Sequence, residues 1–242
     1  MIYSRKAVRN AFRQLLIQIY KDAMLILLML APVLCGLFFK LGIPFAQSLI
    51  EQYLGYPELF VPYYLLFDLL LGCITPLLYC FAAAYIILGE IDDGISGYLS
   101  VTPLGKKGYL IARLGFPAVL AFFVSILMLL LFSLTDLTFF HILGIALSAA
   151  LMGLMEAMLV VAISGNRVEG MAVSKLSGLF FLGLPIPFFV KGGVRYLLFF
   201  LPSLWTAEFI LQQELRLLLI GIVVAIMWIM LLYGRFIRKI KR

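Results

Sequence analysis

The residues that build most catalytic and metal sites are scarce in this sequence. It has one histidine, His141, and three cysteines among 242 residues, and only 13% of its residues are charged. A zinc protease helix needs two histidines four residues apart, so that site cannot be assembled here. A Gly-x-Ser-x-Gly elbow is absent, and residues 100–107 lack the first glycine and the hydroxyl of a phosphate-binding loop. We therefore expect no enzyme, no metal site and no cofactor in this chain.

Apolar side chains take the place of charge, at 64% of the residues with a mean hydropathy of +1.13. A soluble domain would carry nearer a quarter charged residues. A membrane-spanning helix needs roughly 20 mostly apolar residues, and six segments qualify: residues 23–43, 61–88, 110–134, 139–163, 173–190 and 217–233. The fifth segment is the weakest, because it is short and contains Pro185 and Pro187. The sequence predicts an all-α integral membrane protein with six transmembrane helices, in one domain of residues 1–242.

The distribution of the 19 lysines and arginines predicts how these spans are oriented. All but four fall on the face that holds both termini; the exceptions are Lys40, Lys191, Arg195 and Arg216. Cytoplasmic loops carry an excess of Lys and Arg, so we expect a plasma-membrane protein with both termini in the cytoplasm. The net charge of +7 mostly reflects this topology. Nucleic-acid binding would need a separate basic domain, and none is predicted.

An amphipathic helix is predicted before the first span. Its apolar face comprises Val8, Phe12, Leu15 and Ile19, and its basic face comprises Arg5, Arg9 and Arg13. Helical period, a basic face and the adjacent span are typical of an interfacial helix on the cytoplasmic surface. A docking role and a simple topology anchor are equally good interpretations of it.

The external segment 191–216 combines Gly192-Gly193, an apolar run, Pro202, Trp205 and Phe209. This pattern predicts a short helix or hairpin that dips into the outer leaflet before the last span, a re-entrant element. Irregular backbone at that depth needs protein or a water-filled cavity around it. An aromatic belt at the membrane surface is an equally good interpretation.

A polar island interrupts the apolar chain at residues 89–107. Acids end the second span, Gly94 permits a sharp turn, and residues 95–99 can form a short surface helix before Thr102-Pro103. Lys106 and Lys107 then meet the headgroups as the third span begins. A rigid cytoplasmic helix joined directly to two spans can transmit force. The plainer interpretation is that any six-span protein needs charged loops.

Two acids, Asp68 and Glu156, lie inside predicted spans at different depths. An intramembrane acid is costly to bury and is a functional hypothesis by default. Arg113, near the inner end of the third span, is a candidate partner for Glu156. We favour polar contacts between helices for both acids over a proton relay, because neither belongs to a chain of acids.

Small residues recur every four positions in the fourth span, at Ala149, Gly153 and Ala157. Such a stripe lets two helix backbones approach closely. Packing within the bundle is the favoured use, and a subunit contact is the alternative.

Taken together, these features resemble a type-2 ABC exporter permease, and the resemblance covers almost the whole chain. That family has an acid at the end of the second span, then a glycine, a leucine, a Thr/Ser-Pro pair, a tyrosine and a cation. The matching residues are Glu90, Gly94, Leu99, Thr102, Pro103, Tyr109 and Arg113. Lysine is commoner where this chain has Arg113. Residues 167–175 resemble a cytoplasmic loop of small drug- or antibiotic-export permeases in the family.

The resemblance implies a mechanism and partners. The permease would pair with a second copy or a similar chain, and two ATPase subunits holding ATP and Mg would dock beneath. The coupling helix at residues 95–99 would pass their motion to the spans, braced by Glu90 and Arg113. The short first external loop, residues 42–60, implies a small or lipid-like substrate. The residues assigned to coupling and docking are Glu90, Asp92, Asp93, Gly94, Leu99, Thr102, Pro103, Tyr109 and Arg113.

Two other functions stay open. A proton-coupled secondary transporter would use Asp68 and Glu156 as carriers, but the paired halves expected of such proteins are not evident. An intramembrane enzyme acting on lipids or peptides lacks a nucleophile–base pair. An ATPase partner would identify the ABC permease, and a requirement for a pH gradient would identify the secondary transporter. A covalent product would identify the enzyme.

Overall fold

The computed structural model describes residues 5–55, 58–95 and 105–240, and all regular elements in these ranges are helical. The helices are α1 (Arg5–Lys21), α2 (Ala23–Leu37), α3 (Ile43–Leu54), α4 (Tyr64–Asp92), α6 (Gly105–Leu110), α7 (Phe116–Phe132), α8 (Phe139–Ile163), α9 (Arg167–Ser177), α10 (Ile186–Phe189), α11 (Pro202–Gln212) and α12 (Leu215–Ile240). Short π-helical turns cover Phe38–Gly42 and Ile111–Gly115, and 3-10 turns cover Val61–Tyr63, Gly178–Gly183 and Gly193–Leu198.

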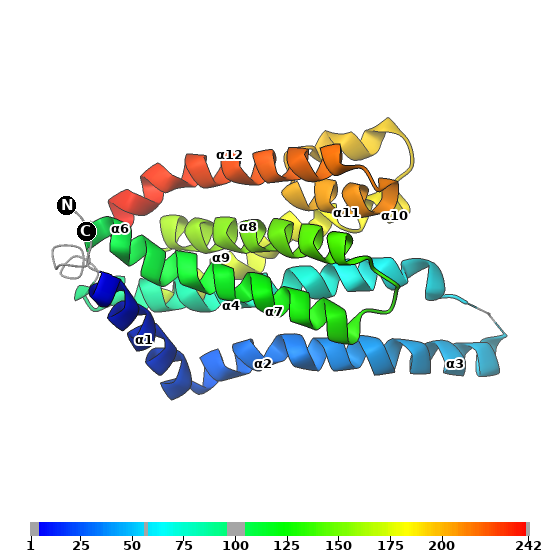
Figure 1. Cartoon of the computed structure of the whole chain (residues 1–242), viewed down its shortest axis with the longest axis horizontal. Helices are drawn as coiled ribbons and strands as arrows, with labels where there is room; N and C mark the ends of the chain where they lie inside the picture. Colours follow the sequence, from blue (N-terminus) through cyan, green and yellow to red (C-terminus); the bar gives the residue numbers. More distant parts are fainter. Residues whose placement is uncertain (1–4, 56–57, 96–104, 241–242) are drawn as a thin grey trace.

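Five helical stretches in the described ranges are long and apolar enough to cross a membrane. They are Ala23–Tyr53, Val61–Asp92, Lys107–Phe132, Phe139–Ile163 and Leu215–Ile240. The prediction of an all-α, multi-pass membrane protein is therefore confirmed, and five of the six predicted spans correspond to these stretches. Figure 1 shows the long helices side by side, with α1 inclined to them at the end that carries both termini.

The prediction of an external loop at residues 42–60 is wrong over most of that range. Gly42 keeps a right-handed helical conformation (φ −73°), so the first span continues through the π turn into α3. The helix ends only at Gly55, which adopts φ +68°, a conformation that glycine tolerates without steric cost. The first apolar helix is consequently longer than hydropathy alone predicted.

The predicted fifth span, residues 173–190, is not a single helix. It consists of the end of α9, a 3-10 turn at Gly178–Gly183 and the four-residue α10. The breaks have a local cause, because Pro185 and Pro187 donate no backbone hydrogen bond and glycine weakens a helix interior. The broken segment nevertheless follows α4 along its length. The Arg167 amide bonds Asp92 at one end of α4, and the Phe189 ring stacks 5.2 Å from that of Tyr63 at the other.

Helices α4 and α8 form the centre of the bundle. Gly153 on α8 faces the kink-forming Pro76 on α4, and a Cβ at Gly153 would lie 2.6 Å from the Pro76 carbonyl oxygen. Ala149 and Ala157, from the same small-residue stripe, are completely buried. The stripe therefore packs within the bundle, as favoured from its spacing.

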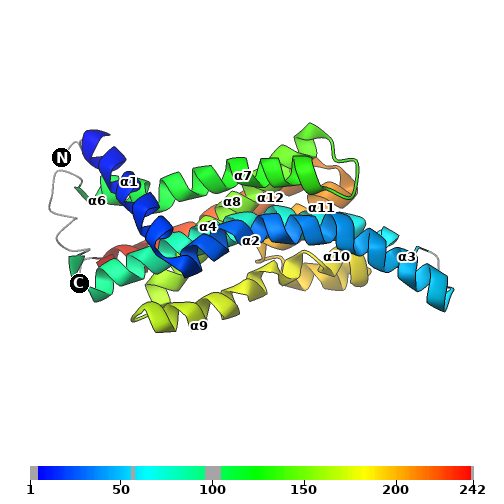
Figure 2. The same cartoon turned by 90° about the horizontal axis from the view of Figure 1, so that it is seen from below.

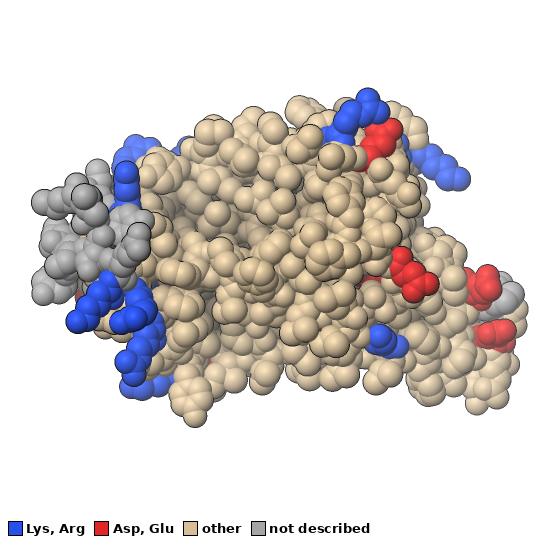
Figure 3. Space-filling view, in the orientation of Figure 1, with Lys and Arg blue, Asp and Glu red and all other residues tan. Residues whose placement is uncertain are grey.

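The outer helices expose mostly apolar side chains. Figure 3 shows a broad belt without charged residues between two ends that carry the visible charges, with Lys and Arg gathered at the end of the termini, and many large apolar side chains are exposed on the molecule. Large exposed side chains of α7 and α12, such as Phe123 and Met230, belong to this belt. A belt of this kind is what a surface in contact with lipid tails requires.

Helix α11 begins well inside the bundle. The Trp228 indole donates a hydrogen bond of 2.9 Å to the Phe200 carbonyl, just before α11. Trp228 lies roughly 20 Å along α12 from its start at Leu215, counted at helical rise. The Ser203 hydroxyl, in the first turn of α11, bonds the Phe180 carbonyl at 2.5 Å. Residues 190–212 therefore run inward from α10 and return outward through α11.

Candidate functional site

The end of α4 and the start of the third span meet in a buried polar cluster, formed by Glu90, Tyr109 and Arg113. Their exposures are 4%, 1% and 1%. The Tyr109 hydroxyl donates to Glu90 Oε2 at 2.8 Å, and Arg113 Nε donates to the same oxygen at 3.2 Å. Arg113 Nη2 forms an ion pair with Glu90 Oε1. Both carboxylate oxygens are thus occupied.

The same arginine also holds the N-terminal helix. Its Nη1 donates 2.8 Å to the carbonyl oxygen of Ala11 in α1, which lies 102 residues earlier in the sequence. Arg113 belongs to the π turn Ile111–Gly115, a type of turn that recurs at functional sites. One guanidinium therefore joins α1, α4 and the start of the third span.

The stability of this cluster depends on every charged group in it having a partner. Burying a charge is favourable only when a partner and hydrogen bonds replace its hydration. Arg113 uses Nε, Nη1 and Nη2, and Glu90 accepts on both oxygens. Loss of one charged member would leave the other buried and unpaired, at about 3–5 kcal/mol. The cluster is consequently a rigid junction.

An open hollow of about 420 Å³ borders the cluster. Its lining comes from α1 (Gln14, Ile17, Gln18, Lys21), from the cluster (Glu90, Arg113) and from Ile95. Ile95 is the first residue of the predicted coupling helix 95–99, and the rest of that helix lies outside the described residues. Leu99, Thr102 and Pro103 lie outside the described residues, so their predicted roles stay predictions.

The acids that follow Glu90 lie at the end of α4. Asp92 Oδ2 accepts a 3.1 Å bond from the Arg167 amide, which ties α4 to the start of α9. Asp93 is exposed at the helix end. Gly94 adopts φ +69°, so its predicted use at a sharp turn is borne out by the backbone.

The start of α9 fits closely against α4 through Arg167, a contact that sequence reasoning missed. A Cβ at Gly89 would lie 1.7 Å from Arg167 Nη2, so a larger residue at this position would displace the guanidinium from its present place. The Arg167 guanidinium carbon lies 5.3 Å from the centre of the Tyr85 ring. A reciprocal cap between Asn166 and Glu169 orders this helix start. The pairing of Asn166 with Glu169 three residues later was the available signal.

The intramembrane acid Asp68 holds the turn between α7 and α8. It accepts from the backbone amides of Leu134 at 2.7 Å and Thr135 at 2.9 Å, and from the Thr135 hydroxyl. Asp68 is 1% exposed. These bonds match the structural interpretation favoured from the sequence.

Glu156 is not the partner of Arg113, so that prediction was wrong. Arg113 is taken up by Glu90, which lies at the same inner end of the bundle, whereas Glu156 is buried on α8 against the end of α9. The Ser177 hydroxyl donates 2.6 Å to Glu156 Oε1. Oε2 has no hydrogen-bond partner among the residues that the structure describes.

A further buried acid, Glu208 on α11, was missed. It is fully buried, and its Oε1 lies 2.9 Å from Arg195 Nε in an ion pair that lacks hydrogen-bond geometry, whereas Gln212 Nε2 donates to Oε2. An acid within the apolar run 204–211 was the signal that could have found it. The segment 191–216 was interpreted as a short helix or hairpin dipping into the outer leaflet, or as an aromatic belt, and the acid within it was not singled out.

With this geometry established, comparisons identify the family. The model of the family described as fluoroquinolones export permease protein Rv2686c-like matches residues 16–233. This chain belongs to that export permease family. The match contains Glu90, Tyr109, Arg113, Asp68 and Glu156, and it begins within α1.

Two curated relatives come from Mycobacterium tuberculosis. They are the fluoroquinolones export permease protein Rv2686c of strain H37Rv and the fluoroquinolones export permease protein MT2760 of strain CDC 1551. Each is 26% identical to this chain over 194 residues, which cover 78% of this chain and 75% of the relative. No solved structure matches the chain. The resemblance to an ABC exporter permease of the drug-export kind is thereby confirmed.

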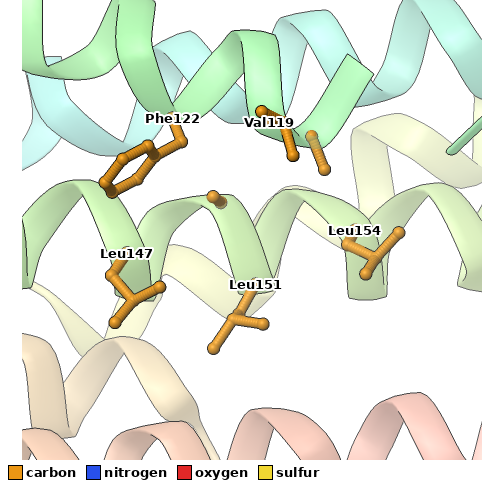
Figure 4. Close-up of a pocket in the computed structure, with 7 residues that line it drawn as sticks. Val119, Phe122, Leu147, Leu151 and Leu154 are labelled. Atoms are coloured by element: carbon orange, nitrogen blue, oxygen red, sulfur yellow. The ribbon is translucent and has the colours of Figure 1, made fainter. Parts of the chain in front are cut away.

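This permease also has an apolar hollow on the belt, between α7 and α8 (Figure 4). Its volume is about 270 Å³, and its lining comprises Ala118, Val119, Phe122, Leu147, Ala150, Leu151 and Leu154. With no polar side chain in that lining, the hollow offers neither charge nor hydrogen bonds. It suits an apolar group such as a lipid tail or a side chain.

Proposed function

We propose that this chain is the membrane subunit of an ATP-driven antibiotic exporter whose substrates include fluoroquinolones. The names of its relatives support this substrate class. The scarcity of catalytic residues supports a transport subunit that relies on a separate ATPase, which would hold ATP and Mg. The distribution of Lys and Arg supports a plasma-membrane protein with cytoplasmic termini.

The observation that carries the proposal is the buried junction of Glu90, Tyr109 and Arg113. It joins α1 to the two spans on either side of the segment 96–104. An ATPase that pushes on this segment would move a rigid corner of three helical elements together. Asp92, Asp93 and Gly94 would position the segment, and Leu99, Thr102 and Pro103 would form the docking surface.

The broken segment 167–190 completes a sixth crossing in this proposal. Its support is the contact with both ends of α4, by Arg167 and by Phe189. A break at glycines and prolines gives such a crossing a point at which its two halves can change angle. The inward and outward path of residues 190–212 supports a re-entrant element beside it.

The permease would work as a pair, with a second copy or a related chain. Two copies would bring their apolar surfaces together and provide two docking corners for two ATPase subunits. The exposed apolar belt supplies surface for such a contact and for lipid.

A proton-coupled transporter is the alternative function, and one observation indicates which residue would carry the proton. Glu156 Oε2 is buried without a partner among the described residues, so this carboxyl group is able to hold a proton. Asp68, by contrast, is engaged by several donors at a turn. A carrier role would therefore fall on Glu156 alone.

The test is purification from the native membrane in mild detergent, followed by reconstitution into vesicles with a labelled fluoroquinolone. The proposal predicts a co-purifying ATPase with a Walker A loop and transport that requires ATP. A preparation without ATPase that moves the drug under a pH gradient would overturn it. Glu156→Gln would then be the variant that abolishes transport, with exposed Glu214→Gln as the matched control.

A further inference from the structure

A third hollow, smaller than the other two, lies at the corner where α1 meets α2. Its volume is about 200 Å³. The α1–α2 corner contributes Gln18, Lys21 and Asp22, and Arg167 from the start of α9 lies across from them. In Figure 2 this corner and the start of α9 lie at the end that carries the termini.

The hollow lies at the boundary of the apolar belt. Lys21 ends α1, and the first apolar span begins two residues later at Ala23. Arg167 follows the span that ends at Ile163. Leu25 and Ile86, both buried, supply an apolar wall on the side of the spans. The lining of the hollow therefore combines charged and apolar side chains.

Its two cations are available to a ligand. Neither Lys21 nor Arg167 takes part in any of the ion pairs formed within the described ranges. Among the described residues, no carboxylate pairs with the Arg167 guanidinium, which packs against the Tyr85 ring and over Gly89. A cation fixed in this way loses little further freedom on binding an anion.

Asp22 adds a negative charge, but that charge is already engaged. Asp22 Oδ1 accepts the Met24 amide at 2.9 Å and the Leu25 amide at 3.4 Å, as the N-cap of α2. The partial positive charge of a helix N-terminus offsets a carboxylate at this position. An anion in the hollow would therefore interact mainly with Lys21 and Arg167.

We propose that this hollow binds the phosphate group of an anionic phospholipid from the cytoplasmic leaflet. Arg167 and Lys21 would contact the phosphate, Gln18 would donate to it, and the acyl chains would follow the apolar wall at Leu25 and Ile86. Basic pockets between transmembrane helices on the cytoplasmic side are typical sites for anionic headgroups. This site rests on the proposed orientation of the termini and requires no ATPase.

The test uses the full-length protein, exchanged into detergent to remove native lipid. Binding of short-chain phosphatidylglycerol, short-chain phosphatidylcholine and inorganic phosphate is measured by native mass spectrometry. Phosphatidylglycerol should bind at least fivefold more tightly than phosphatidylcholine. Lys21→Gln and Arg167→Gln should each weaken its binding roughly fivefold, as removal of one cation near a headgroup predicts.

Arg216→Gln is the matched control, because Arg216 is an exposed cation of the opposite end and should leave binding unchanged. If Arg167→Gln fails to fold, Lys21→Gln decides, since Lys21 is exposed. Unchanged phosphatidylglycerol affinity in Lys21→Gln would overturn the proposal. Inorganic phosphate that binds as tightly as the lipid would also overturn it, and would identify a site for free anions.

Discussion

Each end of the molecule contains a Glu–Arg pair with a buried glutamate, and the two pairs differ in what they join. At the end that carries the termini, which is the inner end in the proposed orientation, Arg113 is 1% exposed and bonds both Glu90 and the α1 backbone. At the outer end, the side chain of Arg195 is 25% exposed, and its partner Glu208 is only 13 positions away in the same segment. The inner pair unites elements far apart in sequence, whereas the outer pair closes one segment on itself.

This difference indicates different mechanical roles. An inner end that is cross-linked through one buried guanidinium moves as a unit, which suits the transmission of force. An outer segment pinned mainly to itself can shift against the bundle when its contacts with α8 and α12 change. Four substitutions test this comparison, from the largest expected effect to the smallest.

Glu90→Ala should lower the free energy of unfolding by about 3–5 kcal/mol, because Arg113 would remain buried without its carboxylate. The double variant Glu90→Ala with Arg113→Ala should recover part of this loss, since no unpaired charge remains. Thermal unfolding of both purified variants measures the effect. A double variant less stable than Glu90→Ala would show that the ion pair is not what makes the single variant unstable.

Glu208→Ala should cost about 1.5–3 kcal/mol, the scale of a hydrogen bond to a charged group. The loss is smaller than at Glu90 because the partly exposed Arg195 can regain water. Exposed Glu214→Ala is the control, with an expected change near zero. A loss for Glu208→Ala equal to that of Glu90→Ala would remove the distinction between the two ends.

Asp68→Asn should cost about 1–2 kcal/mol, because an amide cannot accept on both of the atoms that Asp68 uses at the turn. Export should fall less than in Glu90→Ala, since this turn is far from the inner junction. Drug uptake by vesicles containing each variant measures the ranking. A larger loss of export for Asp68→Asn would mean that Asp68 lines the transport path.

Tyr109→Phe should have the smallest effect, about 1.5 kcal/mol, the low end of the scale for a hydrogen bond to a charged group, because it removes one donor and leaves the ion pair in place. Glu90 Oε2 would keep its bond from Arg113 Nε. Thermal unfolding and export both test this expectation. Stability as low as in Glu90→Ala would show that the hydroxyl, rather than the ion pair, holds the junction.

Much of the fold followed from hydropathy and charge, and the misses have physical causes. Hydropathy measures composition, so it gave residues 173–190 as one span although glycine and proline break the helix there. It also ended the first span at Gly42, where the backbone remains helical. Apolar composition alone does not show whether a glycine ends a helix or lies within it.

At the candidate site, Glu90, Tyr109 and Arg113 were indicated by the resemblance to the exporter permease family, whose motif they match. The sequence could not supply the Ala11 carbonyl, because a backbone acceptor leaves no mark in side-chain pattern. Nor could it pair Arg113 correctly, since Glu90 and Glu156 were both acids near inner span ends. Glu208 was missed because the re-entrant element at residues 191–216 was predicted from its glycines, proline and aromatic residues, and the acid within it was not considered.

The most direct test of the central claim is the amount of drug exported per ATP hydrolysed. It would be measured in vesicles that hold the permease with its co-purified ATPase, for the wild type and for Glu90→Ala at equal protein levels. The account predicts that the variant still inserts and that ATP hydrolysis continues while export falls at least tenfold. Unchanged export per ATP in Glu90→Ala would contradict the claim that the inner junction couples the ATPase to the spans.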